Sequence, residues 1–365
     1  MTPYYEQDGV VVHLGDCREV LAQMPSESIQ TCVTSPPYFG LRSYLPTDHT
    51  DKANEIGLEP TVDLYVAEMV AVFREVRRVL KDDGSLWLVL GDSYANNGIS
   101  QPQRDTSGGF SGRDQGTRGK QGYANASGAG IKLRVPQGLK PKDLIGIPWR
   151  VAFALQAEGW YLRQDIIWAK NNPMPESVTD RCTKAHEYIF LLTKNARYYY
   201  NAAAIAETSV GPGRIPGGNH KVDASRNDDG RDMSIPVGIT RNKRSVWTVT
   251  TKPFSEAHFA TFPPALIEPC ILAGSRPGDV VLDPFMGSGT TGEVSQHLER
   301  KFIGIELNPE YIPMAIKRMS QPALGLFSAQ HAYDTTDKAQ SDYLDDWLAQ
   351  TNPTLERVEC DALGG

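Results

Sequence analysis

The stretch VVLDPFMGSGTTG, residues 280–292, decides the fold of this chain. It indicates a buried strand, a turn with three glycines and the start of a helix, an order in which glycine lets the backbone approach a ligand closely. Gly287, Gly289 and Gly292 satisfy the spacing GxGxxG of dinucleotide sites. A second apolar run ends in Glu306, and a carboxylate at such a strand end can accept both hydroxyl hydrogens of a ribose. The motif therefore predicts a site for a nucleoside-containing ligand.

The kind of nucleoside ligand stays open at this point. No Gly-Lys-Ser/Thr follows the glycines, which excludes a P-loop. NAD and S-adenosylmethionine both remain, as does a tight turn that binds nothing. The sequence Asp283-Pro284-Phe285 ahead of the glycines disfavours NAD, because a dinucleotide site opens with small residues that let the pyrophosphate reach the helix N-terminus.

Outward from this motif, seven short apolar runs recur, and helical patterns lie between several of them. The runs are continuous rather than alternating, which is typical of strands buried on both faces. They are Val10 to Leu14, Thr31 to Val33, Leu86 to Leu90, Asp165 to Trp168, Tyr188 to Leu192, Val280 to Leu282 and Phe302 to Ile305. Helices are expected over Asp63 to Leu80, Pro148 to Ala157, Pro263 to Ala273 and Pro309 to Met319, the last capped by Asn308. This alternation predicts an α/β fold with a doubly wound, mostly parallel, seven-stranded sheet.

A second motif, Thr34-Ser35-Pro36-Pro37-Tyr38, directly follows a predicted strand, and ligands bind at strand carboxyl ends in such sheets. The prolines fix two φ angles and remove two donors, so we expect the carbonyls of Ser35 and Pro36 to face outward as acceptors. The Ser35 hydroxyl and the Tyr38 ring complete a set that suits a planar base carrying an amino group. Acceptors on both amino hydrogens favour a pyramidal nitrogen, whose lone pair can attack a methyl group in line. A proline-stiffened turn without chemistry is the alternative.

Charge is distributed unevenly along the chain. Its 365 residues carry a formal net charge of −7, so affinity for nucleic acid must come from local basic surfaces. Two polar, core-poor stretches, residues 95–142 and 208–245, concentrate Arg and Lys. The five scattered cysteines, the absence of a signal peptide and the lack of a membrane-length apolar run predict a cytoplasmic protein with no metal site and no membrane partner.

Together the motifs resemble those of the amino-methylating DNA methyltransferases of bacteria and phages, in the permuted (β) class that places TSPPY or DPPY before FxGxG. Three further segments fit the resemblance: Gly15-Asp16-Cys17, Phe259 to Pro263, and Arg181 with His186-Glu187, the last without a derived role. The resemblance implies the S-adenosylmethionine-dependent methyltransferase fold with inserted DNA-binding loops. It also implies S-adenosylmethionine as cofactor, double-stranded DNA as substrate, base flipping, and a cognate restriction endonuclease as a candidate partner.

By this resemblance, residues 1–94 form the catalytic-loop half of the domain, 95–145 a Gly-rich basic insertion and 146–207 the continued domain. Residues 208–255 form a target-recognition insertion, 256–320 the cofactor-binding half and 321–365 an acidic tail. The catalytic residues implied are Ser35, Pro36, Pro37 and Tyr38. Those for the cofactor are Asp16, Cys17, Thr34, Phe262, Pro263, Asp283, Pro284, Phe285, Gly287, Ser288, Gly289 and Glu306. Those for DNA are Arg214, Lys221, Arg226, Arg241, Lys243 and Arg244.

The target atom is inferred from the residue that precedes Pro-Pro in this motif, which is Ser35. In this family Ser before Pro-Pro is typical of N4-cytosine enzymes and Asp of N6-adenine enzymes, although both side chains accept a hydrogen bond. The sequence therefore favours cytosine N4, with adenine N6 as the alternative. C5-cytosine chemistry is disfavoured because no cysteine lies in this loop. An NAD-dependent dehydrogenase, an inactive binding module and a protein or RNA methyltransferase are the other readings, and the dehydrogenase leaves the Ser-Pro-Pro-Tyr motif without a purpose.

Overall fold

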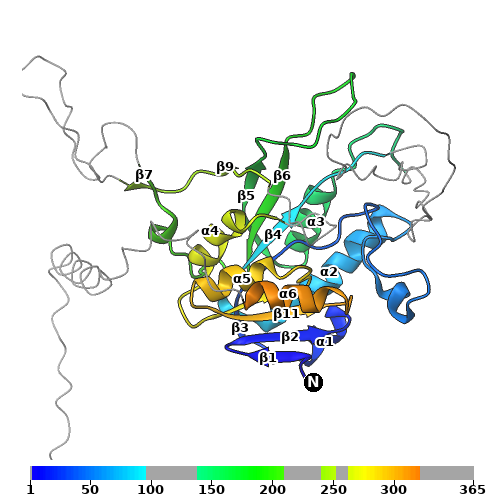
Figure 1. Cartoon of the computed structure of the whole chain (residues 1–365). Helices are drawn as coiled ribbons and strands as arrows, with labels where there is room; N and C mark the ends of the chain where they lie inside the picture. The colour runs from blue at the N-terminus through cyan, green and yellow to red at the C-terminus, as the bar shows by residue number, and fades with distance from the viewer. Residues whose placement is uncertain (1, 96–137, 209–239, 252–261, 321–365) are drawn as a thin grey trace, which may run out of the picture. The chain divides into compact units, whose positions relative to one another are not determined.

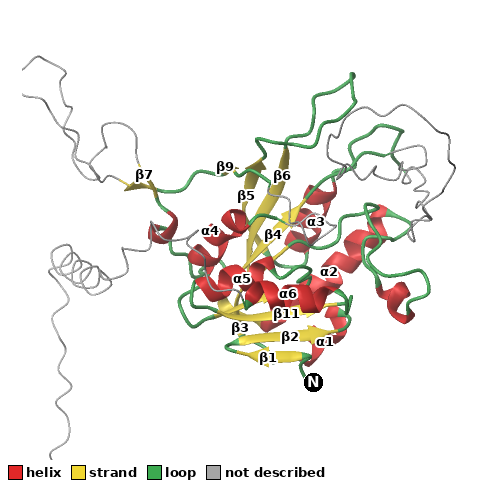
Figure 2. Cartoon of the chain, viewed as in Figure 1, coloured by secondary structure: helices red, strands yellow, loops and turns green. Residues whose placement is uncertain are grey.

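A nine-stranded sheet organises the part of the chain that the computed structural model describes, residues 2–95, 138–208, 240–251 and 262–320 (Figures 1 and 2). The strand order is β1-β2-β11-β10-β3-β4-β6-β5-β9. The bounds are β1 Tyr5–Gln7, β2 Val10–Leu14, β3 Ile29–Thr34, β4 Leu80–Leu90, β5 Tyr161–Ala169, β6 His186–Thr193, β9 Val246–Thr248, β10 Val280–Asp283 and β11 Lys301–Glu306. A separate antiparallel pair joins β7 Glu207–Thr208 and β8 Thr240–Arg241.

The direction of the strands brings several loops to one edge of the sheet. Strands β2, β11, β10, β3 and β4 run parallel, and β6 runs antiparallel between β4 and β5. The carboxyl ends of β3, β4, β5, β10 and β11 therefore share one edge, here called the carboxyl edge, and the amino end of β6 joins them there. This is the edge at which doubly wound sheets bind their ligands.

Three helices cover each face of the sheet. One face carries α1 Cys17–Gln23, α2 Val62–Val79 and α3 Ile147–Ala157, and the other carries α4 Pro264–Gly274, α5 Thr290–His297 and α6 Tyr311–Met319. Strand β4 contributes to both layers, because Leu86, Leu88 and Leu90 pack in the first core and Trp87 and Val89 in the second. Burial on both faces explains why its sequence is continuously apolar.

All seven predicted apolar runs lie within strands, which confirms the predicted α/β fold. The sheet has nine strands rather than seven because β1 and β9, of three residues each, extend its two edges. The last helix begins at Tyr311 rather than Pro309, because Asn308 caps a preceding turn and its Oδ1 accepts the Glu310 N–H at 2.9 Å. Helix α1, only seven residues long, was not predicted. Within the described ranges, no helix has the length and apolar character needed to cross a membrane.

Candidate active site

A hydrogen bond between strands joins the two sequence motifs. Strand β10 pairs with β3 on one side and β11 on the other, so Thr34 and Asp283 end adjacent strands. The Thr34 hydroxyl donates to Asp283 Oδ1 at 2.6 Å, and the Thr291 hydroxyl donates to Oδ2 at 2.7 Å. The Phe285 N–H also donates to Oδ1, at 3.0 Å. Burial raises the pKa of Asp283 to about 6, although the three hydrogen bonds act to lower it. The carboxylate therefore ties the Ser-Pro-Pro-Tyr loop to the glycine loop from inside the protein.

The glycine loop takes a backbone conformation that L-side chains rarely adopt. Gly287 has φ +53° and Gly289 has φ +78°. A Cβ at Gly289 would lie 3.0 to 3.2 Å from atoms of Ala315 in α6, so this glycine permits close helix packing. A Cβ at Gly287 would meet only the Phe285 carbonyl oxygen, at 3.9 Å. Gly287 therefore faces open space, which is where a ligand can approach the backbone.

Glu306 is the second buried carboxylate of the carboxyl edge. It ends β11, and its two oxygens accept the N–H groups of Gly287 and Asn308, each at 2.8 Å. Burial raises the pKa of Glu306 to about 7, and the nearby Asp283 charge acts in the same direction. Each carboxylate oxygen keeps a lone pair, because a carboxylate accepts about four hydrogen bonds. Glu306 can therefore bind a pair of ribose hydroxyls, as its position in the sequence predicts.

Ser288 lies in the loop, but its hydroxyl is directed to the protein interior. Arg318 Nη1 donates to the Ser288 hydroxyl at 3.2 Å and to the Thr290 hydroxyl at 2.8 Å, and its Nε pairs with Glu293. Arg318 is only 9% exposed and supports the glycine loop from α6. The motifs of the sequence did not predict a role for Arg318. Its position, a cation on the apolar stripe of a predicted helix, is the sequence feature that could have indicated this role.

Asp16 and Cys17 reach the same edge, since the Gly15 N–H donates to the Glu306 carbonyl at 2.9 Å. The Asp16 carboxylate is engaged by Arg18, whose Nη2 lies 2.5 Å from Oδ2, and Asp16 also caps α1 through the Arg18 N–H. This pairing was not expected from the sequence. Burial raises the pKa of the Cys17 thiol to about 12, so the thiol stays protonated and apolar.

The Ser-Pro-Pro-Tyr loop is fixed by two hydrogen bonds to other segments. The Tyr65 hydroxyl of α2 donates to the Pro37 carbonyl at 2.8 Å, and the Tyr38 hydroxyl donates to Glu187 Oε2 at 2.7 Å. Burial, aided by the Glu187 charge, raises the pKa of Tyr38 well above its ordinary value. Pro36 is buried, whereas Ser35 is half-buried at the end of β3. The loop is therefore a rigid element that leaves Ser35 partly accessible.

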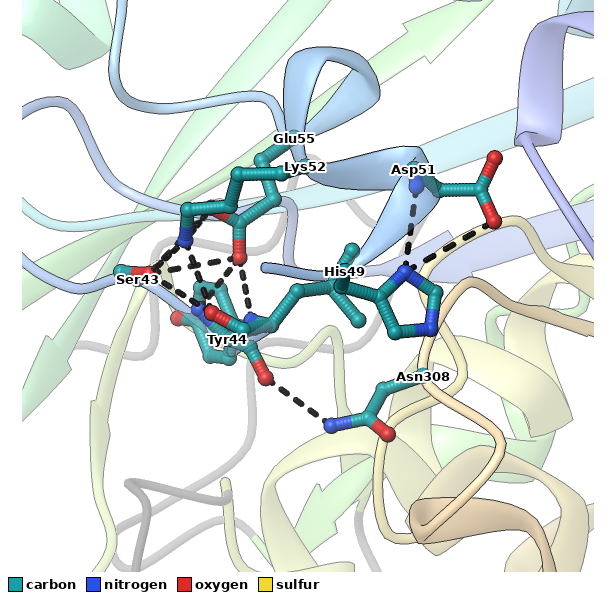
Figure 3. A network of polar contacts seen from close by, with 8 residues as sticks. Ser43, Tyr44, His49, Asp51, Lys52, Glu55 and Asn308 are labelled. Atoms are coloured by element: carbon teal, nitrogen blue, oxygen red, sulfur yellow. Dashed lines mark hydrogen bonds and ion pairs between the residues drawn. The ribbon is translucent and has the colours of Figure 1, made fainter. Parts of the chain in front are cut away.

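The segment after the loop is tied over the end of β11 by a buried carboxylate (Figure 3). The Glu55 side chain is only 2% exposed and accepts the N–H groups of Tyr44, at 2.6 Å, and Leu45. Lys52 Nζ pairs with it at 2.6 Å. Asn308 Nδ2 donates to the Tyr44 carbonyl at 2.9 Å, which joins the segment to the residues beside Glu306. No motif in the sequence signalled this network.

Two further predicted cofactor residues lie at the amino end of α4, and other predicted residues lie outside the described ranges. Pro263 is buried at the start of α4, and Phe262 packs against the second core. Phe259 to Thr261 and the predicted DNA-binding Arg214, Lys221 and Arg226 lie outside the described residues. Among the residues that are described, no cluster of three or more His, Cys, Asp or Glu could hold a metal ion.

Two of the three described DNA-binding candidates are ion-paired. Glu207 Oε2 lies 3.5 Å from Arg241 Nε and 2.9 Å from Arg244 Nε. Lys243 Nζ lies 5.2 Å from the centre of the Trp247 ring. The three cations precede β9, which pairs in parallel with the carboxyl-terminal half of β5, so they lead away from the carboxyl edge. Figure 1 shows the neighbouring β7 on the opposite side of the view from α2.

A parallel sheet with a glycine loop, a buried carboxylate and a Ser-Pro-Pro-Tyr loop at one edge is the arrangement expected of a methyltransferase with a nucleoside cofactor. The family model described as DNA methylase, of the N6/N4 type, matches residues 29–317, and the chain belongs to this family. Relatives include the Type II methyltransferase M.Cfr9I of Citrobacter freundii, 45% identical over 86% of this chain and 89% of that protein. M.SmaI of Serratia marcescens is 46% identical over 84% of this chain and 89% of that protein.

The fold likeness extends to a solved structure. The PvuII DNA methyltransferase (cytosine-N4-specific) superposes with a TM-score of 0.56 at 20% identity, over 88% of this chain and 90% of that one. The match shows a shared fold and confirms the predicted methyltransferase architecture.

The raised pKa of Glu306 predicts a pH dependence of stability. Its folded-state pKa of about 7 exceeds the ordinary 4.5, so burial favours the protonated form. The stability that this provides is complete below the unfolded-state pKa and is lost as pH rises through the folded-state pKa. Relative to Glu306→Gln, wild type should lose about 1–3 kcal/mol of unfolding free energy between about pH 5 and pH 8. Denaturant unfolding of both proteins without cofactor measures this, and a difference that does not change with pH would contradict it.

Proposed function

We propose that this DNA methyltransferase transfers a methyl group from S-adenosylmethionine to the exocyclic N4 of cytosine in double-stranded DNA. The observation that carries the proposal is the bond from Thr34 to Asp283, which places the Ser-Pro-Pro-Tyr loop beside the glycine loop. A base within a duplex cannot reach Ser35, so the target cytosine leaves the stack. Since curated relatives are Type II methyltransferases, we infer a cognate restriction endonuclease as partner and action in the cytoplasm.

The residues present fit S-adenosylmethionine. Glu306 holds the ribose hydroxyls, and its pKa of about 7 allows the ionised form that accepts both of them. Gly287 leaves its backbone open to the ligand, and we assign the neighbouring Ser288 backbone to the same site. Asp16 and Cys17 lie beside β11, on the side where the adenine would follow the ribose. When bound, the cofactor supplies an electrophilic methyl group to this edge.

The chain's own groups prepare the nucleophile. The Ser35 hydroxyl and the Pro36 carbonyl accept the two hydrogens of the target amino group, which frees the nitrogen lone pair. As the nitrogen bonded to the methyl carbon, the carbon–sulfur bond would break, and one amino proton would then be released to solvent water. Positioning and fixed dipoles supply the rate, because no residue of the loop is a covalent nucleophile. Adenine N6 is the second candidate, since its amino group offers the same two hydrogens.

The base is identified directly by nucleoside mass spectrometry of DNA from cells that express the protein. We expect N4-methylcytosine, with N6-methyladenine at background. Ser35→Ala removes one acceptor of the amino hydrogens and should lower the product by about tenfold or more, the cost of an unpaired polar contact at a reacting group. Accumulation of N6-methyladenine alone would replace N4 by the adenine alternative, and unmodified DNA would contradict both.

Substitution of Gly287 tests the cofactor site. Gly287→Val should weaken S-adenosylmethionine binding by more than about tenfold, because a β-branched side chain strains a positive φ and fills the ligand approach. Gly278→Val is the matched control: Gly278 also has a positive φ of +81°, with nothing within 4 Å of its Cβ, but it lies at the opposite edge of the sheet. Titration calorimetry measures both. Equal affinity in wild type and Gly287→Val would show that the loop is misassigned.

The described basic cluster is proposed to hold the DNA backbone. Arg241, Lys243 and Arg244 lead away from the carboxyl edge, so we infer contacts to phosphate rather than to the flipped base. Sequence-specific contacts are assigned to the rest of residues 208–255. Each phosphate contact releases condensed counterions, so its loss flattens the salt dependence of binding.

Neutralising all three cations to Gln should lower DNA affinity and reduce the slope of log K against log salt by about 2–3. S-adenosylmethionine binding should not change. A second triple variant is the control: Lys81→Gln, Arg197→Gln and Lys301→Gln remove the same charge at the opposite edge of the sheet. Fluorescence anisotropy across a salt series compares them. If the two triple variants show the same affinity and slope, the cluster has no special role in DNA binding.

A further inference from the structure

Glu187 belongs, with Arg181 and His186, to the sequence segment whose role was left open, and its contacts lead to the Ser-Pro-Pro-Tyr loop. It lies at the amino end of β6, which reaches the carboxyl edge because β6 runs against β4 and β5. Its Oε2 accepts the Tyr38 hydroxyl at 2.7 Å. The other oxygen of Glu187, Oε1, pairs with the ammonium group of Lys170, which is the residue after β5. The Glu187 carboxylate, on β6, thus joins the Ser-Pro-Pro-Tyr loop to the end of β5.

The surroundings hold this arrangement in place. The Lys170 and Glu187 side chains are each only 18% exposed, and Lys170 Nζ lies 4.3 Å from the centre of the Trp168 ring. The Tyr38 ring packs directly on Gly91, where any Cβ would overlap it. The ring is therefore held by a glycine on one side and by a charged acceptor at its hydroxyl. A hydrogen bond to an ionised acceptor is about twice as strong as a neutral one.

We propose that Glu187, oriented by Lys170, is a positioning residue that fixes the Tyr38 ring against which the flipped base rests. The proposal rests on the proposed function, because it assumes that Tyr38 contacts the target base. Prolines precede Tyr38 and fix the backbone, but they leave its χ1 and χ2 angles free. Packing on Gly91 restricts the ring, and the Glu187 contact fixes the position of its hydroxyl. A ring that turns away from its working orientation lowers the rate of methyl transfer without removing any group that binds DNA or cofactor.

A double-mutant cycle tests the route of this effect. Glu187→Ala should lower kcat by about tenfold and leave KM for DNA and for S-adenosylmethionine within about twofold, since the lost bond is one charge-assisted contact. Glu187→Gln should recover most of the rate, because its amide oxygen still accepts the Tyr38 hydroxyl. Tyr38→Phe should cost about as much as Glu187→Ala, and adding Glu187→Ala to Tyr38→Phe should cost nothing more.

The control is Glu176→Ala, which removes a carboxylate from the segment between β5 and β6 that pairs with Arg181 and not with Tyr38. It should leave kcat unchanged. Steady-state rates over a series of DNA and S-adenosylmethionine concentrations give kcat and KM, and single-turnover rates with melting temperatures of each variant complete the comparison. The positioning role would be overturned if the kcat losses of the two single variants multiply in the double variant, or if KM rises at unchanged kcat. In either case N4-methylcytosine would still be made. A wild-type protein that leaves DNA unmodified would overturn the proposed function as well.

Discussion

The 2.6 Å hydrogen bond from the Thr34 hydroxyl to Asp283 is the contact on which the site depends. It joins residues 249 positions apart in the sequence, at the ends of two parallel strands that lie next to each other. Because β10 is paired with both β3 and β11, the catalytic loop, the glycine loop and Glu306 are fixed relative to one another by the register of the sheet. A change in that register would separate the reacting groups.

Several carboxylates with little solvent exposure lie at this edge, and their hydrogen-bond and ion-pair partners differ. Asp283 is held by two hydroxyls and a backbone N–H, and Glu306 by two backbone N–H groups. Glu55 and Glu187 each combine a lysine with an uncharged donor. An unpaired buried charge would cost several kcal/mol, so these partners are needed for the fold. Within the described part of the chain, Asp283 and Glu306 have no cation as a partner, and burial raises the pKa of each.

Much of the fold could be predicted because its strands are buried on both faces. Continuous apolar runs marked seven strands, and the short edge strands β1 and β9 gave too little pattern to detect. The motifs also placed Ser35, Gly287 and Glu306 at one edge, since strand ends in parallel sheets coincide. Contacts between distant side chains could not be predicted. Nothing local links Glu187 to Tyr38, Arg318 to Ser288 or Glu55 to Tyr44, and the pairing of Asp16 with Arg18 depends on how α1 begins. Such contacts follow from tertiary packing, which a single sequence does not encode in any short pattern.

We infer that one edge of the sheet holds the cofactor and the flipped base together. A crystal structure of the protein with S-adenosylhomocysteine and a duplex containing its target site tests this most directly. We expect the ribose hydroxyls on Glu306, and the target cytosine out of the stack with its amino group between the Ser35 hydroxyl and the Pro36 carbonyl. A cofactor bound away from Gly287 and Glu306, or a target base seated elsewhere than at Ser35 and Pro36, would contradict the account.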